Sequence, residues 1–578
     1  MLFKAIEQVS RLIAFDKSRF IFLIIILGFT AMLETFGFAS IIPLMESVLD
    51  SDNPSNVGRF FQSLFNFFGI ELTIYSSALM FLILMLTKNF LRVYSEFLRS
   101  DISYAFKTNS IKSIAQSNLN SKYEKYIKAK QGTLINNTIT ETQNSTMGLQ
   151  QLVFLISGVI TLPLFFFLML YSSFELTLGL LFVSILVYIS LDRPIKNYAR
   201  KVGLEEIKLN QEITSDITEA YSGFRQIRVL DITDVVIKKI HLKLKRLKFI
   251  LVKWDVISSS TIPITEMSLV FIIVGYFFLM EAFYTNVDYK NIIPTLSMIV
   301  VVAYKSMSQL SRLLVNKMAL DRYVPSMSLV GDLINSSSNK LEKREKKKLK
   351  STNYKDLGDL YLDHVNFGYD KNTILKDLTG VFKIGEISLI MGPSGSGKST
   401  LVDILLGLNK PQSGIVSLKG INSLNSNQGD WKSNIGYVSQ ETFLFHLSIK
   451  ENLLLGAKRT SIKKIRSFCK LAEIDDFIMS LPNRYDTNLD DKGLNLSGGQ
   501  RQRISIARAL LRDPFILIFD EATSALDKKT SEKIMKNIRS VRKEKIIIFI
   551  SHDLSMRKYC DSYFEISKGK LVSHEEKN

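Results

Sequence analysis

Residues 392–400, with the sequence GPSGSGKST, have the residue types and spacing of a loop that binds phosphate groups. They lie between an apolar run that favours a strand, EISLIM, and one that favours a helix, LVDILLGL. In this context the backbone N–H groups of the loop surround phosphates at the N-terminus of the helix. Lys398 would reach the β- and γ-phosphates, and the Ser399 hydroxyl would bind Mg²⁺. The flanking strand and helix disfavour a chance match, so the pattern predicts a nucleoside triphosphate site.

Two adjacent carboxylates, Asp520 and Glu521, end a second apolar run in the segment FILIFDEATSALD (residues 515–527). Carboxylates at a strand end can divide the work of hydrolysis between them. Asp520 would hold the metal through water, and Glu521 would orient or deprotonate the attacking water. The alternative is a pair of solvated acidic side chains, which the phosphate loop on the same chain makes less favourable.

A third segment, LNLSGGQRQRISIARALLRDP (residues 494–514), joins small residues to a predicted helix from Gln500 to about Leu511. Its Ser497-Gly498-Gly499 loop would offer free N–H groups and a helix dipole to a phosphate. Twelve helical residues span about 18 Å, so the spacing allows the loop to lie well outside the phosphate site of its own chain. A return of the helix towards that site is also compatible with the spacing. We expect a second copy, facing the first head to tail, to bring its Ser497 and Gly499 to each phosphate loop.

The first part of the chain contains long apolar runs rich in Phe, Ile and Leu, whereas the remainder has the composition of a soluble domain. The length of 578 residues predicts two or more domains. An apolar run of about 20 residues spans a bilayer. Six spans are predicted, centred on residues 20–44, 73–95, 152–171, 175–191, 257–280 and 291–315.

The formal net charge of +19 is compatible with nucleic-acid binding, but the placement of the basic residues indicates membrane topology instead. Lys and Arg crowd the segments between spans two and three and between spans four and five, whereas loops 50–72 and 281–291 are slightly acidic. By the positive-inside rule, the N-terminus and the C-terminal domain face the cytoplasm. We therefore predict a multi-pass protein of the inner (cytoplasmic) membrane with no nucleic-acid partner. Cys469 and Cys560 imply no disulfide framework.

The cytoplasmic connections, roughly residues 96–150 and 192–256, are too long for structureless loops and predict helices that continue past the membrane. Residues 336–353, SSSNKLEKREKKKLKSTN, have the composition of a solvated charged linker. Beyond it, short β-like runs alternate with helical stretches, which predicts a largely parallel sheet. We expect an α-helical six-span transmembrane domain with long cytoplasmic helix extensions over residues 1–335, and an α/β P-loop nucleotide-binding domain over residues 354–578.

The order of these motifs resembles the ATP-binding cassette of ABC transporters. Six spans followed by one cassette resemble a half-transporter of the exporter type, and the resemblance covers essentially the whole chain. It implies ATP and Mg²⁺ as cofactors, ATP hydrolysis coupled to transport, and a homodimer with a second copy of the chain in the membrane.

The resemblance also implies roles for individual residues. Tyr369 in FGYD matches the aromatic residue that stacks on adenine, Gln440 in GYVSQETFLF the glutamine that senses Mg²⁺, and His552 in FISHDL the histidine that contacts the γ-phosphate. A lone histidine is more often a core or surface residue, but this one follows an apolar strand. The expected catalytic residues are therefore Glu521, His552 and Gln440, and the expected metal-binding residues are Ser399, Gln440 and Asp520. The residues expected to bind nucleotide are Tyr369, Gly392, Pro393, Ser394, Gly395, Ser396, Gly397, Lys398, Ser399 and Thr400, with Ser497, Gly498, Gly499, Gln500 and Asp527 acting across the dimer.

One departure from the family pattern precedes the signature, where Asp490 and Asp491 replace the usual Gly-Glu pair. The second position keeps its charge with a shorter reach, so the departure concerns coupling between the cassette and the membrane part. No residue of the ATP site is degraded, which favours a homodimer over a heterodimer with one weakened site. Intact Glu521 and His552 favour an ATP-driven pump over an ATP-gated channel or regulator on the same fold. The six spans exclude the soluble ATPases of the cassette type.

Four basic residues lie within or just below predicted spans, namely Lys88, Arg92, Lys305 and Arg312. Counted inward from Tyr75 and Ile292, Lys88 and Lys305 each lie thirteen residues down their spans, or about 20 Å. Arg92 and Arg312 follow on the same helix faces. Charges at this depth are costly and usually face a cavity or a partner, whereas snorkelling to the inner head groups is the alternative. The sharper interpretation is an anion-binding cavity for phosphate or pyrophosphate.

Glu34, in AMLETFGFASIIPL of span one, is expected nearer the outer side, either as a structural polar contact or as part of an exit path. The patterns ETFGFASIIPLM of span one and YKSMSQLSR of span six also resemble, more weakly, those of bacterial lipid-linked oligosaccharide flippases. We therefore predict an anionic, amphipathic, lipid-linked substrate that is moved outward from the cytoplasmic side. A peptide, a lipid A-type lipid or a drug is the alternative, and the neighbouring genes would narrow the choice.

Overall fold

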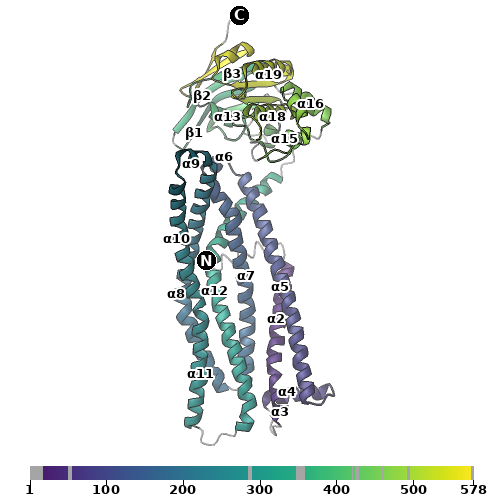
Figure 1. Cartoon of the computed structure of the whole chain (residues 1–578), viewed down its shortest axis with the longest axis vertical. Helices are drawn as coiled ribbons and strands as arrows, with labels where there is room; N and C mark the ends of the chain where they lie inside the picture. Colours follow the sequence, from purple (N-terminus) through teal and green to yellow (C-terminus); the bar gives the residue numbers. More distant parts are fainter. Residues whose placement is uncertain are drawn as a thin grey trace. The chain divides into compact units, whose positions relative to one another are not determined.

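The chain divides into two compact units: Met1–Ser121 with Lys125–Glu342 form the first, and Lys122–Glu124 with Lys343–Asn578 form the second. The first consists of helices, and the second contains two sheets with helices packed on them (Figure 1). This computed structural model describes residues 17–49, 55–172, 174–283, 289–345, 358–370, 372–418, 421–422, 428–457, 460–490 and 495–574.

Several helices of the first unit are much longer than a membrane span. Helices α5, α7, α8 and α12 have 46, 42, 49 and 57 residues, whereas about 20 residues cross a bilayer. The long connections are therefore extensions of the spanning helices themselves, as the sequence predicts. The elements are α2 (Lys17–Ala39), α3 (Ile41–Leu49), α4 (Asn56–Phe67), α5 (Ile74–Leu119), α6 (Tyr123–Lys128), α7 (Gln131–Ser172), α8 (Phe174–Ser222), α9 (Phe224–Leu230), α10 (Thr233–Ser259), α11 (Thr261–Phe283) and α12 (Tyr289–Glu345).

Three stretches within the described ranges are long and apolar enough to cross a membrane: Lys17–Val48, Ile74–Leu119 and Gln131–Tyr171. They contain the first three predicted spans. The other three predicted spans fall in α8, α11 and α12, where many of the side chains lie outside the described residues. The shortest of these helices, α11, still has 23 residues, which is enough to cross a bilayer.

Ion pairs as well as apolar side chains join the helix extensions. Arg322 on α12 contacts Glu206 on α8 at 3.0 Å, and both side chains are largely buried. A Cβ atom at Gly203 would lie 2.1 Å from the carbonyl oxygen of Arg322, so the two helices approach closely here. A buried ion pair with two well-aligned hydrogen bonds fixes the register of the helices that carry it.

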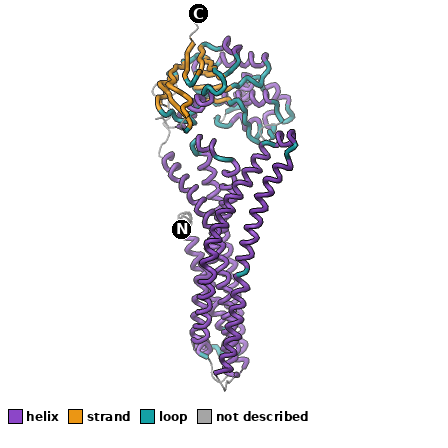
Figure 2. Tube along the Cα trace, turned by 90° about the vertical axis from the view of Figure 1, so that its left-hand side faces the viewer, coloured by secondary structure: helices purple, strands orange, loops and turns teal. Residues whose placement is uncertain are grey.

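The second unit holds an antiparallel sheet and a larger, mostly parallel sheet, drawn in orange in Figure 2. The first has the order β2-β1-β4-β5 and the second the order β10-β9-β3-β8-β7-β6, in which only β10 is antiparallel to its neighbour. The strands are β1 (Leu360–Tyr369), β2 (Asn372–Phe382), β3 (Ile387–Met391), β4 (Ser413–Leu418), β5 (Ile421–Asn422), β6 (Ile435–Val438), β7 (Ile516–Asp520), β8 (Ile546–Ile550), β9 (Ser562–Ser567) and β10 (Lys570–His574).

The central parallel strands are almost entirely apolar because both of their faces are covered. Every residue of β3 and β8 is buried, which is typical of strands between two layers of helices or sheet. Phe519 and Phe549 stack on neighbouring strands with ring centroids 4.5 Å apart. The helices and 3₁₀ turns of this unit are α13 (Lys398–Leu405), α14 (Gln428–Ser433), α15 (Ile449–Leu454), α16 (Ile462–Leu471), α17 (Asp475–Ser480), η3 (Arg484–Asp486), α18 (Gly498–Leu511), α19 (Lys528–Ser540), η5 (Arg542–Glu544) and η6 (Leu554–Tyr559).

The structure modifies the expectation of a linker over residues 336–353. Helix α12 continues to Glu345, so the first part of this segment is helical, and residues 346–357 lie outside the described residues. Its run of Lys and Glu is compatible with a solvated helix as well as with a solvated linker, because both residue types favour helices. The domain boundaries at residues 335 and 354 stay a proposal.

Candidate functional site

The strands that carry the predicted nucleotide residues end at one edge of the larger sheet. Strands β3, β8, β7 and β6 are parallel neighbours, so their carboxyl ends meet at that edge, where α/β proteins bind ligands. At or just after these ends lie Gly392, His552, the pair Asp520–Glu521, and Gln440. The topology therefore brings together residues from four separate motifs.

The loop between β3 and α13 has a backbone that requires its glycines. Gly395 and Gly397 have φ angles of 78° and 108°, in the region that favours glycine. A Cβ atom at Gly397 would lie 2.7 Å from the Leu375 Cδ2 atom, so a side chain would not fit between the loop and β2. Helix α13 begins at Lys398, and the N–H groups of its first turn therefore have no acceptor within the helix.

The lining of this loop fits nucleotide phosphates with Mg²⁺. The Ser396 hydroxyl is buried and has no hydrogen-bond partner among the residues described. Lys398 Nζ lies across the loop and donates to the carbonyl oxygens of Gly392 and Pro393 at 2.6 and 2.9 Å. A hydroxyl donor, an ammonium group and a helix N-terminus match the acceptor oxygens of phosphate. Ser399 and Asp520 are the residues that would hold Mg²⁺, which prefers oxygen ligands.

Glu521 is held from two sides by other predicted residues. Gln440 Nε2 donates to Glu521 Oε2 at 2.5 Å, and His552 Nδ1 lies 3.1 Å from Glu521 Oε1. The φ angle of Glu521 is 47°, which is uncommon for a residue with a side chain, and its N–H group donates to the carbonyl of Ile550 on β8. A carboxylate with both oxygens fixed at the edge of the phosphate site can orient a water molecule or accept its proton.

The sequence interpretation missed Tyr437, which lies three residues before Gln440. Its hydroxyl donates to Asp520 Oδ2 at 3.2 Å. Burial raises the pKa of the Asp520 carboxyl and this hydrogen bond opposes the shift, while burial and the nearby Asp520 raise the pKa of Tyr437. The phenol therefore stays a donor and fixes one oxygen of the carboxylate. A tyrosine inside an otherwise buried strand was the available signal.

Tyr369, the residue expected to stack on adenine, is tied to the helix of the phosphate loop. Its hydroxyl donates to Asp403 Oδ2 at 3.5 Å and accepts from Asn409 Nδ2 at 3.0 Å. The Phe367 ring meets the Tyr369 ring edge to face, with centroids 5.1 Å apart. Asp403 lies on α13, and burial raises the pKa of its carboxyl to about 6. No pattern in the sequence singles out Asp403 or Asn409.

Replacing Asp403 with asparagine is expected to stabilise the protein near neutral pH but not in acid. The pKa of Asp403 is about 6 in the folded chain, mainly because of burial, against about 3.9 in an unfolded chain. Between these values the unfolded chain binds fewer protons, so the free energy of unfolding falls as the pH rises from about 4 to about 6. Asparagine keeps an acceptor for the Tyr369 hydroxyl without the charge.

We expect the Asp403→Asn protein to have a free energy of unfolding higher than wild type by about 1 kcal/mol at pH 7.5, after allowance for partial exposure of the carboxyl. The difference should vanish near pH 4. Denaturant unfolding of the full chain in detergent measures both values. A difference that does not change over this pH range would contradict the effect of the Asp403 charge.

The signature helix α18 begins at Gly498, two residues earlier than predicted, and ends at Leu511. Ser497 caps it: its Oγ atom accepts from the N–H group of Gln500 at 3.2 Å, and Gln500 Oε1 accepts from the N–H group of Ser497 at 2.8 Å. This reciprocal pair is a capping box. The hydroxyl of Ser497 is therefore used to begin its own helix.

The N-terminal end of α18 lies beside the segment that follows β7. Gln502 Nε2 donates to the carbonyl oxygen of Glu521 at 3.2 Å. A Cβ atom at Gly499 would lie 3.0 Å from the carbonyl oxygen of Ala525, within the segment Ser524–Asp527. Whether the signature lies outside the phosphate site of its own chain stays a prediction.

The site that two copies would share stays a prediction. Its support is that Ser497 and Gly498 are exposed beside the segment Ser524–Asp527, whose residue Asp527 caps α19 by accepting from the N–H group of Thr530 at 2.9 Å. Of the two aspartates before the signature, Asp490 is exposed and Asp491 lies outside the described residues.

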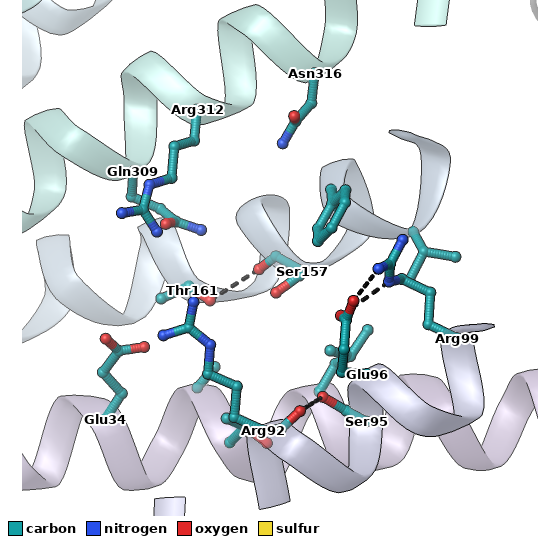
Figure 3. Close-up of a pocket in the computed structure, with 15 residues that line it drawn as sticks. Glu34, Arg92, Ser95, Glu96, Arg99, Ser157, Thr161, Gln309, Arg312 and Asn316 are labelled. Carbon is teal, nitrogen blue, oxygen red and sulfur yellow. Dashed lines mark hydrogen bonds and ion pairs between the residues drawn. The ribbon is translucent and has the colours of Figure 1, made fainter. Parts of the chain in front are cut away.

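A cavity of about 350 Å³ lies between four helices of the first unit (Figure 3). Arg92 and Arg312 line it, and neither guanidinium group has an acceptor within hydrogen-bonding distance among the residues described. A third arginine, Arg99, is paired with Glu96 on its own helix, with one bond of 3.0 Å. The lining comes from α2 (Leu27, Thr30, Ala31, Glu34), α5 (Arg92, Ser95, Glu96, Arg99), α7 (Val153, Phe154, Ser157, Thr161) and α12 (Gln309, Arg312, Asn316).

The four cations expected in one anion cavity are not equivalent. Only Arg92 and Arg312 line the cavity, together with Glu34. Lys88 Nζ lies 3.5 Å from Glu34 Oε1, so Lys88 has a carboxylate partner. Lys305 Nζ lies over the Phe38 ring, 5.3 Å from its centroid. Glu34 is thus a polar contact, one of the two roles expected for it, and whether Lys88 and Lys305 touch substrate stays a prediction.

Comparison with known proteins identifies the second unit. The sequence pattern of the family described as ABC transporter matches residues 375–524. The second unit is an ABC transporter domain. A domain of this family uses ATP with Mg²⁺, so the predicted cofactors are confirmed.

Individual relatives differ in how much of this chain they match. A probable ABC transporter ATP-binding/permease protein of Haemophilus influenzae is 39% identical over 217 residues, which cover 38% of this chain and 39% of the relative. The heterocyst differentiation ATP-binding protein HepA of Nostoc is 28% identical over 455 residues, which cover 77% and 72% of the two chains. The alignment with the first of these relatives thus spans about two fifths of its length.

A solved bacterial Atm1-family ABC exporter with ATP bound has the same fold as this chain. The TM-score is 0.75 at 20% identity, and the match covers 96% of this chain and 95% of the other. The predicted fold class, a helical membrane domain followed by an α/β cassette, is confirmed. The likeness to membrane exporters and the long apolar helices indicate a membrane-embedded protein.

Proposed function

We propose that this chain is one half of an ATP-driven exporter that works as a homodimer. The observation that carries the proposal is the meeting of Glu521, Gln440 and His552 beside the phosphate loop. An intact water-activating carboxylate supports repeated hydrolysis rather than a single binding event. Because the same chain carries long apolar helices, the energy of hydrolysis is available to move a substrate across a membrane.

In this proposal each side chain of the site has a separate task. Lys398 and the N–H groups of the loop bind the β- and γ-phosphates, and Asp520, held by Tyr437, faces the metal. Glu521 accepts the proton of the attacking water, while Gln440 and His552 fix the orientation of its carboxylate. Ser497 and Gly499 of a second copy close the site.

The basic cytoplasmic connections support an inner-membrane location with the N-terminus and the ABC transporter domain in the cytoplasm. In that orientation ATP is available to the domain, and transport runs from the cytoplasmic side outward. The first unit would then cross the membrane six times, with the extensions of α5, α7, α8, α10 and α12 on the cytoplasmic side.

We propose an anionic, amphipathic lipid as the cargo, of the kind in which a polyprenyl chain carries a pyrophosphate-linked glycan. Two guanidinium groups in one cavity, without an acceptor in the described part of the chain, favour a phosphate group, which arginine binds with paired hydrogen bonds. A second cavity of about 490 Å³, lined by α2, α4 and α7, is almost wholly apolar and suits a hydrocarbon chain. The weaker resemblance of spans one and six to lipid-linked oligosaccharide flippases points the same way.

Two alternatives follow from other observations. Several relatives, among them a putative multidrug export protein of Staphylococcus aureus that is 38% identical over 217 residues, favour a drug as the cargo. An ATP-gated channel or regulator on the same fold would hydrolyse ATP without moving a solute in one direction.

Replacing both Arg92 and Arg312 with glutamine tests the cargo class. Farnesyl pyrophosphate serves as the probe, and farnesol, which lacks the charge, as its matched control. We expect the probe concentration for half-maximal stimulation of ATP hydrolysis to rise at least about tenfold, because hydrogen bonds to charged groups are lost. Hydrolysis without the probe should stay at the wild-type rate.

Lys317→Gln removes a positive charge from α12, the helix that carries Arg312, at a position outside the cavity where Lys317 lies over the Tyr188 ring. It should change neither the half-maximal probe concentration nor the rate of hydrolysis without the probe. A double variant with Lys88→Gln and Lys305→Gln should raise the half-maximal probe concentration less than the arginine double variant does. If the arginine double variant responds to farnesyl pyrophosphate like wild type, the cavity is not the site of the cargo's phosphate.

A further inference from the structure

Glu34 places one negative charge in the cavity. Apart from the paired Glu96 and Arg99, the other charged groups of its lining are positive. Its carboxylate and the guanidinium groups of Arg92 and Arg312 are directed into the same space (Figure 3). Outside the lining, Lys88 Nζ lies 3.5 Å from Glu34 Oε1, with the two side chains 10% and 23% exposed. Three cations therefore lie around a single carboxylate, which leaves a net positive charge.

The two carboxylates of the cavity differ in how firmly they are held. Glu96 uses both of its oxygens on Arg99, three residues along the same helix, and the Arg99 guanidinium also lies over the Phe154 ring at 4.3 Å. Among the residues described, Glu34 has one ion-pair contact, at 3.5 Å, and it joins two different helices, α2 and α5. A long contact through one oxygen is more easily exchanged than a pair of aligned hydrogen bonds.

A cavity with only cations would release a phosphate group slowly. Opposite charges attract strongly where little water screens them, and a transporter must release its cargo in each cycle. A carboxylate in the same cavity weakens this attraction because it repels the phosphate group. Glu34 is the carboxylate of this cavity that is not paired within its own helix.

We propose that Glu34 is a built-in counter-anion that opposes binding of the cargo's phosphate to Arg92 and Arg312 and so promotes its release. This inference rests on the proposed transport of an anionic lipid. It assigns Glu34 a role in release, beyond that of a structural partner for Lys88.

The test compares Glu34→Gln with wild type in proteoliposomes, using farnesyl pyrophosphate as the probe. We expect half-maximal stimulation of ATP hydrolysis at a probe concentration lower by about fivefold to tenfold, because one repulsive charge is removed. The maximal rate of ATP-dependent probe movement should fall at the same time, because release is slower. A variant that is only less well folded would not bind the probe more tightly.

Two further variants complete the design. Glu34→Asp keeps the charge and should have the wild-type half-maximal probe concentration. This variant separates the effect of charge from that of packing. Glu96→Gln removes the other carboxylate of the cavity, but Arg99 stays against Phe154, so this variant should lower the half-maximal probe concentration less than Glu34→Gln does. If Glu96→Gln reproduces the effect of Glu34→Gln, net charge alone is responsible and the role of Glu34 is wrong.

The role of Glu34 is also wrong if wild type responds to the probe and Glu34→Gln has the same half-maximal concentration and the same maximal rate. If wild type hydrolyses ATP but neither it nor any variant responds to farnesyl pyrophosphate, the anionic cargo is wrong and the inference falls with it. The two failures are therefore distinguishable in one set of measurements.

Discussion

Glu521→Gln is expected to leave ATP binding intact and to lower the rate of hydrolysis by about 10²-fold or more, the scale of losing a general base. Glutamine keeps the size of the side chain and an oxygen for the contact with Gln440, but it does not accept a proton from water. The phosphate and metal contacts of Lys398, Ser399 and Asp520 remain, so nucleotide should accumulate in a closed dimer. Phosphate release and nucleotide binding by the purified protein in detergent measure both effects.

The matched control is Glu441→Gln, an exposed glutamate that follows Gln440 in the sequence. This substitution also removes one negative charge near the site, but it leaves the contacts of Glu521 in place. The variant should therefore hydrolyse ATP at the wild-type rate. If Glu521→Gln hydrolyses ATP near the wild-type rate, Glu521 is not the general base that activates water. Loss of both binding and hydrolysis would mean that Glu521 holds the nucleotide rather than activating water.

Mixing chains that carry Lys398→Ala with chains that carry Ser497→Arg should restore part of the activity that each variant lacks alone. In a head-to-tail dimer each site takes its phosphate loop from one chain and its signature from the other. The mixed dimer therefore has one site with both defects and one site with neither. We expect almost no hydrolysis by either pure variant and a substantial fraction of wild-type activity in the mixture, measured after the chains are purified together through two different tags.

The contradicting results are equally specific. Normal hydrolysis by pure Ser497→Arg protein would show that the signature is not needed at any site, because no intact signature is then present. Absence of activity in the mixture would show that the two residues act within one chain. The capping contacts of Ser497 with Gln500 make a stability check necessary, so Ser497→Asp, which preserves a helix cap, is the control for folding.

Much of the candidate nucleotide site at the edge of the larger sheet was predictable, because many of its residues belong to short motifs with fixed strand and helix neighbours. The loop at residues 392–400 and Glu521 were predicted from such motifs, and Gln440 and His552 from the resemblance to the ATP-binding cassette. The parallel order β3-β8-β7-β6 brings them to one edge. Tyr437 and Asp403 were missed because their partners, Asp520 and Tyr369, are distant in the sequence. No periodic pattern encodes a contact between two strands or between a strand and a helix elsewhere in the fold.

The cationic cavity was predictable in composition but not in detail. Counting residues along a span gives the depth of Lys88 and Lys305 but not the neighbour that each one meets. Packing of α5 against α2 places Lys88 beside Glu34, and packing of α12 places Lys305 over Phe38. For the same reason, helix length alone did not determine where α18 leads the signature.

Movement of a fluorescently labelled polyprenyl pyrophosphate in proteoliposomes tests the central proposal, ATP-driven export, most directly. The lipid is placed in both leaflets, and a membrane-impermeant quencher reports how much of it remains on the side of the ABC transporter domain. Wild type is expected to move the lipid away from that side only when ATP and Mg²⁺ are added, and Glu521→Gln is expected not to move it. Steady ATP hydrolysis by wild type without any directional movement, or equal movement with and without ATP, would contradict the proposal.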